Sequence, residues 1–437
     1  MWLGIIMLVA GMLAQPARAV TLLRDPDIEH ALKKVAAPLL KAAGLGTTRM
    51  DIMLIDDRSL NAFVVDSANI FIHSGLLLKM DSAAMLQAVI AHEAAHITNG
   101  HLARRPVNLR NARTASGIGM ALAAAAAVAA GAGEAAGVAA MGASNTAMRM
   151  FFVHTRAEEN AADETGMRYL ARAGVDPRGM VKVMDIFRGQ ELLSSARQDP
   201  YARTHPLSRD RLRVIKRLAE AYGDSARQEP ETEYWFQRAK GKLSAFKRDP
   251  GWTLNRVGET GFADIAAMRE AVAHHRRSDL ARAAAAIDRA ITARPADPYY
   301  HELKGQIMIE NRRFGAAVTA YGKAVDLAPE NALILGAYGR ALLAADQVGQ
   351  AVRYLERARA RDGRNARVLR DLAQAYARQG NNGMAALVTA ERYAMSGRLP
   401  DAGIHAKRAS GLLPRGSTGW RRAQDVLAAA ERAGKDK

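Results

Sequence analysis

The chain has 437 residues, long enough for two or three domains, and its lack of cysteine excludes a disulfide-stapled fold and a thiolate metal site. The net charge is +18 and the pI is near 10.3, yet no nucleic-acid-binding motif accompanies this charge, so we expect no nucleic-acid partner. We interpret the charge as a solvated basic surface that can make peripheral contact with an anionic membrane.

The N-terminus has the form of an export signal. Residues 1–14 are apolar, and Pro16-Ala17-Arg18-Ala19 follows them with the A-x-A pattern of a cleavage site. We therefore predict a signal peptide at residues 1–19 and an exported mature protein. The apolar run is short for a membrane span. No Lys or Arg precedes it, so an upstream start or a retained anchor remains open.

The first folded segment is predicted to combine a helix with a small sheet. Residues 26–44 repeat apolar side chains near a 3.6-residue period, which indicates an amphipathic helix that Pro38 can kink or end. Three short strands are expected after it, at residues 50–55, 63–65 and 69–72. A short helix is expected at residues 74–80. An exposed edge of this sheet could pair with an extended peptide backbone.

A helix predicted to begin near Asp81 carries Ala91-His92-Glu93-Ala94-Ala95-His96, an H-E-x-x-H motif. On a helix His92 and His96 lie one turn apart on the same face, so both imidazoles can bind one metal ion. Zinc suits this pair because it accepts neutral imidazole and acts as a Lewis acid. Glu93 would then deprotonate the water that attacks a peptide carbonyl. Two histidines at this spacing also occur by chance, so further ligands decide the interpretation.

A catalytic zinc site needs a third protein ligand, and the segment 156–163 offers one. Glu159 and Asp163 are four residues apart and share a face of the helix predicted at residues 158–172. Glu159 is the predicted third ligand, and Asp163 can orient His92 by accepting its free ring N–H. Glu158 competes as the ligand, but only Glu159 fits both the spacing and the pairing with Asp163.

The Ala- and Gly-rich segment 114–150 lies between the two motifs. Glu134 is the only charged residue between Arg113 and Arg149. A membrane span remains open. Ala and Gly are weakly apolar and Gly clusters interrupt the run, however, so we favour an apolar lid or helical hairpin over the metal cleft.

Downstream, Thr204-His205-Pro206-Leu207 places a histidine in a loop between helices predicted at residues 178–193 and 209–222. His205 has two possible roles, as a donor that stabilises the oxyanion or as a fourth zinc ligand that holds the site shut. We favour the closed form for the resting protein. Arg211 either contacts the cleft or is a surface charge.

These motifs together resemble a family. R-x-x-E-x-x-A-D after H-E-x-x-H, followed by T-H-P-L, is similar to the zinc metallopeptidases that include HtpX, the CAAX prenyl protease and the BepA-like periplasmic enzymes. The resemblance runs from about Leu60 to Arg211 and extends into the helical repeats. It implies a gluzincin-type peptidase with His92, His96 and Glu159 on one zinc ion. It also implies apolar helices between the two motifs, a periplasmic location and a role at the outer membrane.

From about residue 264 the sequence repeats every 34 residues. Small residues recur at this period at Ala283, Ala317, Ala351 and Ala385, and Pro295 and Pro329 follow it too. This is the tetratricopeptide pattern, in which small residues lie where two helices cross. We predict a capping helix at residues 418–433 and a surface for peptide or protein segments.

The expected fold is mainly α with a small β-sheet. A zinc peptidase domain at residues 20–225 is followed by a helical linker at 226–263 and a tetratricopeptide solenoid at 264–437. The function we expect is a zinc endopeptidase of the cell envelope that degrades misfolded or stalled outer-membrane proteins, with the repeats capturing substrates or assembly partners. The alternatives are a chaperone-like adaptor with a latent protease site and an integral membrane peptidase.

Overall fold

The computed structural model describes residues 21–46, 50–103, 155–194, 197–227 and 229–435. The chain divides into two compact units, one of residues 1–24 and 31–236 and the other of residues 25–30 and 237–437. We call them the N-terminal unit and the repeat unit. The predicted signal peptide and the predicted lid at residues 114–150 lie outside the described residues. Within the described part of the chain, no helix combines the length and apolar character that crossing a membrane requires.

The N-terminal unit contains a four-stranded sheet with the strand order β1-β2-β4-β3. The strands are β1 (Leu22–Leu23), β2 (Asp51–Ile55), β3 (Ala62–Val64) and β4 (Asn69–His73). β2 and β4 run parallel, and β1 and β3 lie antiparallel at the two edges. The sequence predicted β2, β3 and β4 to within one residue of their ends. β1 is too short to show an alternating pattern.

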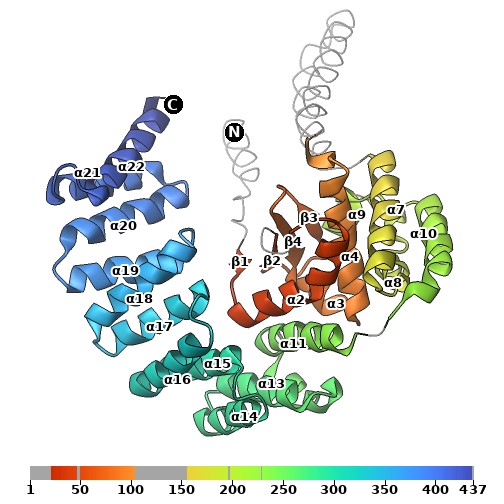
Figure 1. Ribbon diagram of the computed structural model, residues 1–437, viewed down its shortest axis with the longest axis horizontal. Coiled ribbons are helices and arrows are strands. Elements are labelled where there is room, and N and C mark those ends of the chain that lie inside the picture. The colour runs from red at the N-terminus through yellow and green to blue at the C-terminus, as the bar shows by residue number, and fades with distance from the viewer. Residues whose placement is uncertain (1–20, 47–49, 104–154, 195–196, 228, 436–437) are drawn as a thin grey trace, which may run out of the picture. The chain divides into compact units, whose positions relative to one another are not determined.

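The helices of the N-terminal unit are α2 (Pro26–Ala42), which extends into the repeat unit, α3 (Ser74–Lys79), α4 (Ala83–Thr98), α7 (Arg156–Ala173), α8 (Arg178–Ile186), α9 (Pro200–Thr204) and α10 (Arg209–Ala221). They include a central helix, α4, against which α2, α7 and α8 pack. All of residues 85–96 in α4 are buried, which is typical of a helix covered on every side. Figure 1 shows α4 between the sheet and helices α7 and α8.

Two glycines allow α7 and α8 to approach α4 closely. A Cβ atom on Gly166 of α7 would lie 3.3 Å from the backbone of Ala91, the residue just before His92. A Cβ atom on Gly179 of α8 would lie 2.4 Å from the carbonyl oxygen of Ala84. The first contact brings α7 against the part of α4 that carries the H-E-x-x-H motif.

Helix α8 is shorter than the sequence predicted. It was expected to reach residue 193 but ends at Ile186, and a 3-10 turn follows at Gln190–Leu192. Gly189 has a φ of +85°, a left-handed conformation that ends the helical path before this turn. His205 was expected in a loop, and it follows directly after the five-residue helix α9.

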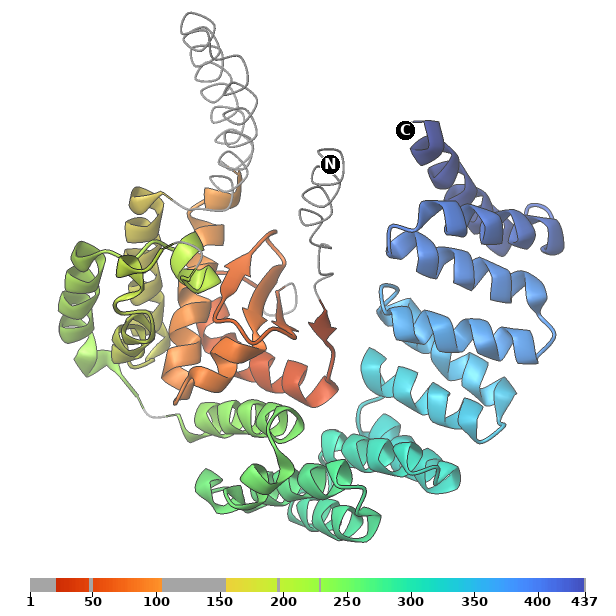
Figure 2. The ribbon, with the colours of Figure 1, turned by 180° about the vertical axis from the view of Figure 1, so that it is seen from behind.

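The repeat unit is a stack of antiparallel helix pairs, seen from behind in Figure 2. Its helices are the second half of α11 (Pro230–Lys247), α12 (Pro250–Leu254), α13 (Ala263–Arg276), α14 (Leu280–Ala293), α15 (Pro298–Glu310), α16 (Phe314–Leu327), α17 (Ala332–Ala344), α18 (Val348–Arg361), α19 (Ala366–Arg378), α20 (Asn382–Met395), α21 (Leu399–Leu412) and α22 (Thr418–Lys435).

The second helices of successive pairs start at residues 280, 314, 348 and 382, which are 34 residues apart. Small residues lie at the helix crossings, as predicted. A Cβ atom on Gly305 would lie 2.7 Å from the Tyr321 ring, and one on Gly339 would lie 2.6 Å from Leu355. The tetratricopeptide arrangement expected from the sequence is therefore confirmed.

Within the repeat unit, a buried ion-pair network connects residues 25–30 with helix α11, and α11 with α15. Asp27 lies 2.7 Å from Nε of Arg238, and Asp25 lies 2.9 Å from Nζ of Lys242. Lys242 also lies 3.8 Å from Glu302 on α15. The side chains of Arg238 and Lys242 are fully buried, so these contacts compensate charges that water does not reach.

Candidate metal centre

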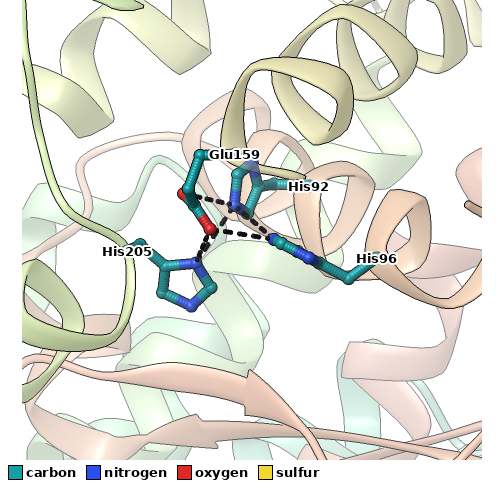
Figure 3. A group of neighbouring side chains, drawn as sticks. All are labelled: His92, His96, Glu159 and His205. Carbon is teal, nitrogen blue, oxygen red and sulfur yellow. Dashed lines mark hydrogen bonds and ion pairs between the residues drawn. The ribbon is translucent and has the colours of Figure 1, made fainter. Parts of the chain in front are cut away.

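Helix α4 places the first two predicted ligands side by side. The Nε2 atoms of His92 and His96 are 3.1 Å apart, and their ring centroids are 4.7 Å apart. Both side chains are fully buried. One helical turn separates them, so both imidazoles project from the same face of α4. Figure 3 shows the two rings converging on one point.

Helix α7 supplies Glu159, the predicted third ligand. Its Oε1 lies 3.3 Å from Nε2 of His96, and its Oε2 lies 3.5 Å from Nε2 of His92. The competing Glu158 has another task, because its side chain accepts a hydrogen bond from the backbone N–H of Thr155 and caps α7. The structure therefore brings Glu159, and not Glu158, to the histidine pair.

His205 completes the cluster from a third part of the chain. Its Nδ1 lies 3.0 Å from Oε1 of Glu159 and 3.3 Å from Nε2 of His92. The side chain is buried and follows α9, so it is attached to neither α4 nor α7. Four protein groups from three separate segments thus offer donor atoms within 4.8 Å of one another, as Figure 3 shows.

The spacing of these donors fits a tetrahedral metal ion. Metal–nitrogen bonds of about 2.0–2.1 Å place neighbouring ligand atoms of a tetrahedron about 3.3–3.4 Å apart. Four of the six donor separations are 3.0, 3.1, 3.3 and 3.3 Å, and all the donor atoms lie within 4.8 Å of one another. Buried carboxylate and imidazole groups in such close contact are costly unless a cation or protons neutralise them. The residues present therefore fit a bound divalent metal.

Asp163 and Arg211 support this cluster from one side. Oδ1 of Asp163 lies 3.1 Å from Nδ1 of His92, the ring nitrogen that faces away from the cluster. Nη1 of Arg211 lies 2.7 Å from Oε2 of Glu159, and its Nε lies 2.7 Å from Oδ2 of Asp163. Arg211 is 1% exposed, so the structure places it inside the site and not on the surface.

Burial and these contacts raise the pKa of one residue of the site and lower the pKa of two others. Burial opposes a charge on His92, but Asp163 and Glu159 outweigh it and raise its pKa to about 10. Burial dominates at His96 and lowers its pKa well below the usual value. Burial also opposes the charge of Glu159, yet His205 and Arg211 hold its pKa well below the usual range. A metal ion at His92 therefore competes with a proton.

Glu93 lies at the edge of the cluster. It is the residue after His92, its side chain is fully buried, and its Oε1 is 3.5 Å from Nε2 of His205. His205 thus lies between Glu159 and Glu93. A carboxylate beside the metal cluster, but outside its four donors, has the position of a general base.

Sequence reasoning missed two buried neighbours of the site. Nδ1 of His101 lies 2.9 Å from Nδ1 of His96. The Tyr201 ring lies 4.4 Å from the His205 ring, and burial together with Glu93 and Glu159 raises the pKa of Tyr201 well above its usual value. The available signals were the spacing of His101 five residues after His96, and of Tyr201 four residues before His205.

Residues 23–219 match the model of peptidase family M48. The chain is 30% identical over 219 residues to the putative beta-barrel assembly-enhancing protease of Vibrio cholerae. The aligned region covers 50% of this chain and 44% of that relative. It is 25% identical over 345 residues to the beta-barrel assembly-enhancing protease of Escherichia coli. That aligned region covers 77% of this chain and 69% of that relative. The chain thus spans less than half of the first relative and about two thirds of the second.

A further relative is the mitochondrial metalloendopeptidase OMA1 of Schizosaccharomyces pombe, 26% identical over 223 residues, with 50% of this chain and 59% of that relative covered. Among solved structures, MamA is 18% identical with a TM-score of 0.32, covering 40% of this chain and 94% of that one. The tetratricopeptide protein YrrB is 18% identical with a TM-score of 0.30, covering 41% and 96%.

Proposed function

We propose, from the premise that residues 23–219 form a peptidase family M48 domain, that the chain is a zinc-dependent endopeptidase of the cell envelope. The observation that carries this proposal is the buried cluster of His92, His96 and Glu159 with Glu93 beside it. Two imidazoles and one carboxylate are a donor set that catalytic zinc uses, whereas magnesium and calcium prefer oxygen ligands.

The reaction follows from the roles of these side chains. Zinc, when bound, supplies a Lewis acid that polarises the scissile carbonyl group. Glu93 accepts a proton from the attacking water on its carboxylate and later gives it to the nitrogen of the leaving amine. Asp163 restrains the ring of His92, because its Oδ1 lies 3.1 Å from Nδ1 of that ring. The buried setting of Glu93 keeps bulk water from competing for that proton.

Strand β3 is suited to hold the substrate. It pairs with β4 along one side and lies at the edge of the sheet that the described residues form. It also packs against α4, which carries Glu93. An extended peptide could add to this edge through backbone hydrogen bonds, and the scissile bond would then run past the metal cluster.

We further propose that the resting site is closed. A catalytic zinc keeps one position open for water or substrate, whereas a site with four protein ligands is closed. The Nδ1 atom of His205 occupies the position of a fourth donor, 3.0 Å from Glu159 and 3.3 Å from His92. His205 would have to move away before water could bind. Because His205 follows α9, it is attached to neither of the helices that carry the other ligands.

The proposed substrates are misfolded or stalled exported proteins, including outer-membrane proteins, in the periplasm. Two relatives carry the name beta-barrel assembly-enhancing protease, and this chain also holds a stack of helix pairs that can present a binding surface to a protein segment. We propose that the repeats capture substrates or the outer-membrane assembly machinery. The closed site favours one second candidate, a chaperone-like adaptor whose protease is latent.

Metal removal and reloading tests the proposal. The purified chain, stripped with a chelator, should lose cleavage of an unfolded β-barrel protein and regain it with about one equivalent of zinc, but not with magnesium. Capture of the same protein without cleavage, in the stripped and zinc-loaded chains alike, would instead support the adaptor. Cleavage that survives complete metal removal would contradict the proposed mechanism.

A further inference from the structure

We propose that His101 is a positioning residue, which holds the imidazole of His96 in the orientation and tautomer that a metal ligand requires. This inference rests on the proposed metal site. The Nδ1 atoms of the two residues are 2.9 Å apart, and their ring planes are inclined at 68° with centroids 4.9 Å apart. His101 is 2% exposed and His96 is fully buried, so bulk water does not compete for this contact.

The chemistry of the metal site determines which nitrogen carries each proton. Nε2 of His96 faces the cluster, 3.1 Å from His92 and 3.3 Å from Glu159, so it must offer its lone pair to the metal. A neutral imidazole then carries its proton on the other ring nitrogen, Nδ1. That N–H points to His101, whose Nδ1 must accept the hydrogen bond. His101 therefore carries its own proton on Nε2.

A glycine turn brings His101 back to the helix that it follows. Helix α4 ends with Asn99 as its C-cap, and the N–H of Gly100 donates to the carbonyl of Ile97. Gly100 has a φ of +71°, a left-handed conformation that a side chain disfavours. Helix α4 ends here, residues 101–103 are helical again, and Nδ1 of His101 lies 2.9 Å from Nδ1 of His96.

The two ligands of α4 are thus oriented by different groups. Asp163, a carboxylate bound by Arg211, faces Nδ1 of His92. A second imidazole, His101, faces Nδ1 of His96. Partners of this kind in other metal sites fix the ring of the ligand and typically change metal affinity by about 10–100-fold when they are removed. Removing the acceptor at residue 101 therefore removes a restraint on the orientation and tautomer of the His96 ring.

The test compares two substitutions of His101. His101→Asn keeps a side-chain oxygen that can accept from Nδ1 of His96, whereas His101→Leu fills the space without an acceptor. Zinc affinity is measured by competition with a chromophoric chelator, and the visible absorption of the cobalt-loaded chain reports ligand geometry. We expect His101→Leu to weaken zinc binding by about 10–100-fold and to alter the cobalt spectrum. His101→Asn should keep most of the zinc affinity and most of the cobalt spectrum of the wild type.

Tyr169→Phe is the matched control. It removes the hydrogen bond from Tyr169 of α7 to Thr98, which lies near the same end of α4 and touches no ligand. This variant should bind zinc as the wild type does. Equal affinity in wild type and His101→Leu, or equal losses in His101→Leu and His101→Asn, would overturn the positioning role and leave the proposed function intact. A wild-type chain that binds no zinc would overturn both.

Discussion

Arg211 pairs with Asp163 through two hydrogen bonds, from Nε to Oδ2 at 2.7 Å and from Nη2 to Oδ1 at 2.9 Å. Its third nitrogen lies 2.7 Å from Oε2 of Glu159 and donates to the carbonyl oxygen of Pro206 at 2.8 Å. One buried guanidinium therefore connects a predicted ligand, the partner of another ligand, and the segment that carries His205. It compensates two buried carboxylates of the site.

Arg211→Met should lower the free energy of unfolding by about 3–5 kcal/mol, because it leaves Asp163 and Glu159 buried without their cation. Arg213→Met is the control on the same helix. Arg213 is 69% exposed and pairs with Asp210, so we expect a loss below about 1 kcal/mol. Urea unfolding of the three proteins measures both values, and similar small losses in the two variants would contradict the role assigned to Arg211.

His96→Ala and Glu159→Ala should each abolish the binding of one zinc ion per chain, because each change removes one of the three ligands on α4 and α7 that hold the ion once His205 has moved away. Glu158→Ala should keep it, since that side chain caps α7 and lies outside the cluster. Metal analysis of the purified chains after dialysis measures this. Full zinc occupancy in both ligand variants would refute the site, and zinc loss in Glu158→Ala would reassign the third ligand.

The candidate site was predictable where its geometry is local. The spacing of His92 and His96 on one helix, and of Glu159 and Asp163 on another, depends only on helical periodicity. The contact between His96 and His101 depends on the left-handed turn at Gly100, which a sequence pattern does not specify. The burial of Arg211 depends on how α10 packs beside α7, so the sequence left its role open.

The fold was predictable for similar reasons. The 34-residue period identified the helix pairs because small residues must recur where helices cross, as Gly305 and Gly339 do. The sequence did not reveal that the chain divides between residues 236 and 237, within α11. That division depends on long-range pairs such as Lys242 with Asp25, which lie more than two hundred residues apart.

Glu302 should make the stability of the repeat unit depend on pH. Burial raises its pKa to about 7, although Lys242 and Arg340 oppose the shift and Asp25 and Asp27 add to it. In the unfolded chain the pKa of Glu302 is near 4.5. As the pH rises, the unfolded chain therefore releases this proton at a lower pH than the folded state does. The contribution of Glu302 is therefore fully present below pH 4.5 and is lost as the pH rises through about 7.

Thermal unfolding at pH 5 and pH 8 tests this expectation in wild type and Glu302→Gln. The glutamine cannot ionise, so the variant should lose less stability than the wild type between the two pH values. An equal loss in both proteins would show that Glu302 does not titrate in this window.

A fragment from residue 258 to the C-terminus should fold as helix pairs, because each pair packs mainly against its neighbours. Circular dichroism during heating measures this. A fragment without helical signal or cooperative melting would contradict the independence of the repeats.

His205→Ala should raise basal cleavage, including self-cleavage, because it removes the fourth donor and opens the proposed zinc site. If His205 instead stabilises the oxyanion, the same change should reduce activity by about 10²–10³-fold. Incubation of the purified variant, followed by electrophoresis and mass spectrometry, distinguishes the two roles. Lower activity without any gain in self-cleavage would refute the closed resting site.

The central claim is that Glu93 acts as the base of a metal-dependent peptidase, and Glu93→Gln tests it most directly. The amide preserves the shape of the side chain but cannot accept the proton. Cleavage of casein is measured for Glu93→Gln in the wild-type and His205→Ala backgrounds, with zinc content determined for each protein. The account predicts one zinc ion per chain and a loss of cleavage of about 10²–10⁴-fold in whichever background is active. Activity within about tenfold of the matched parent, at equal zinc content, would contradict it.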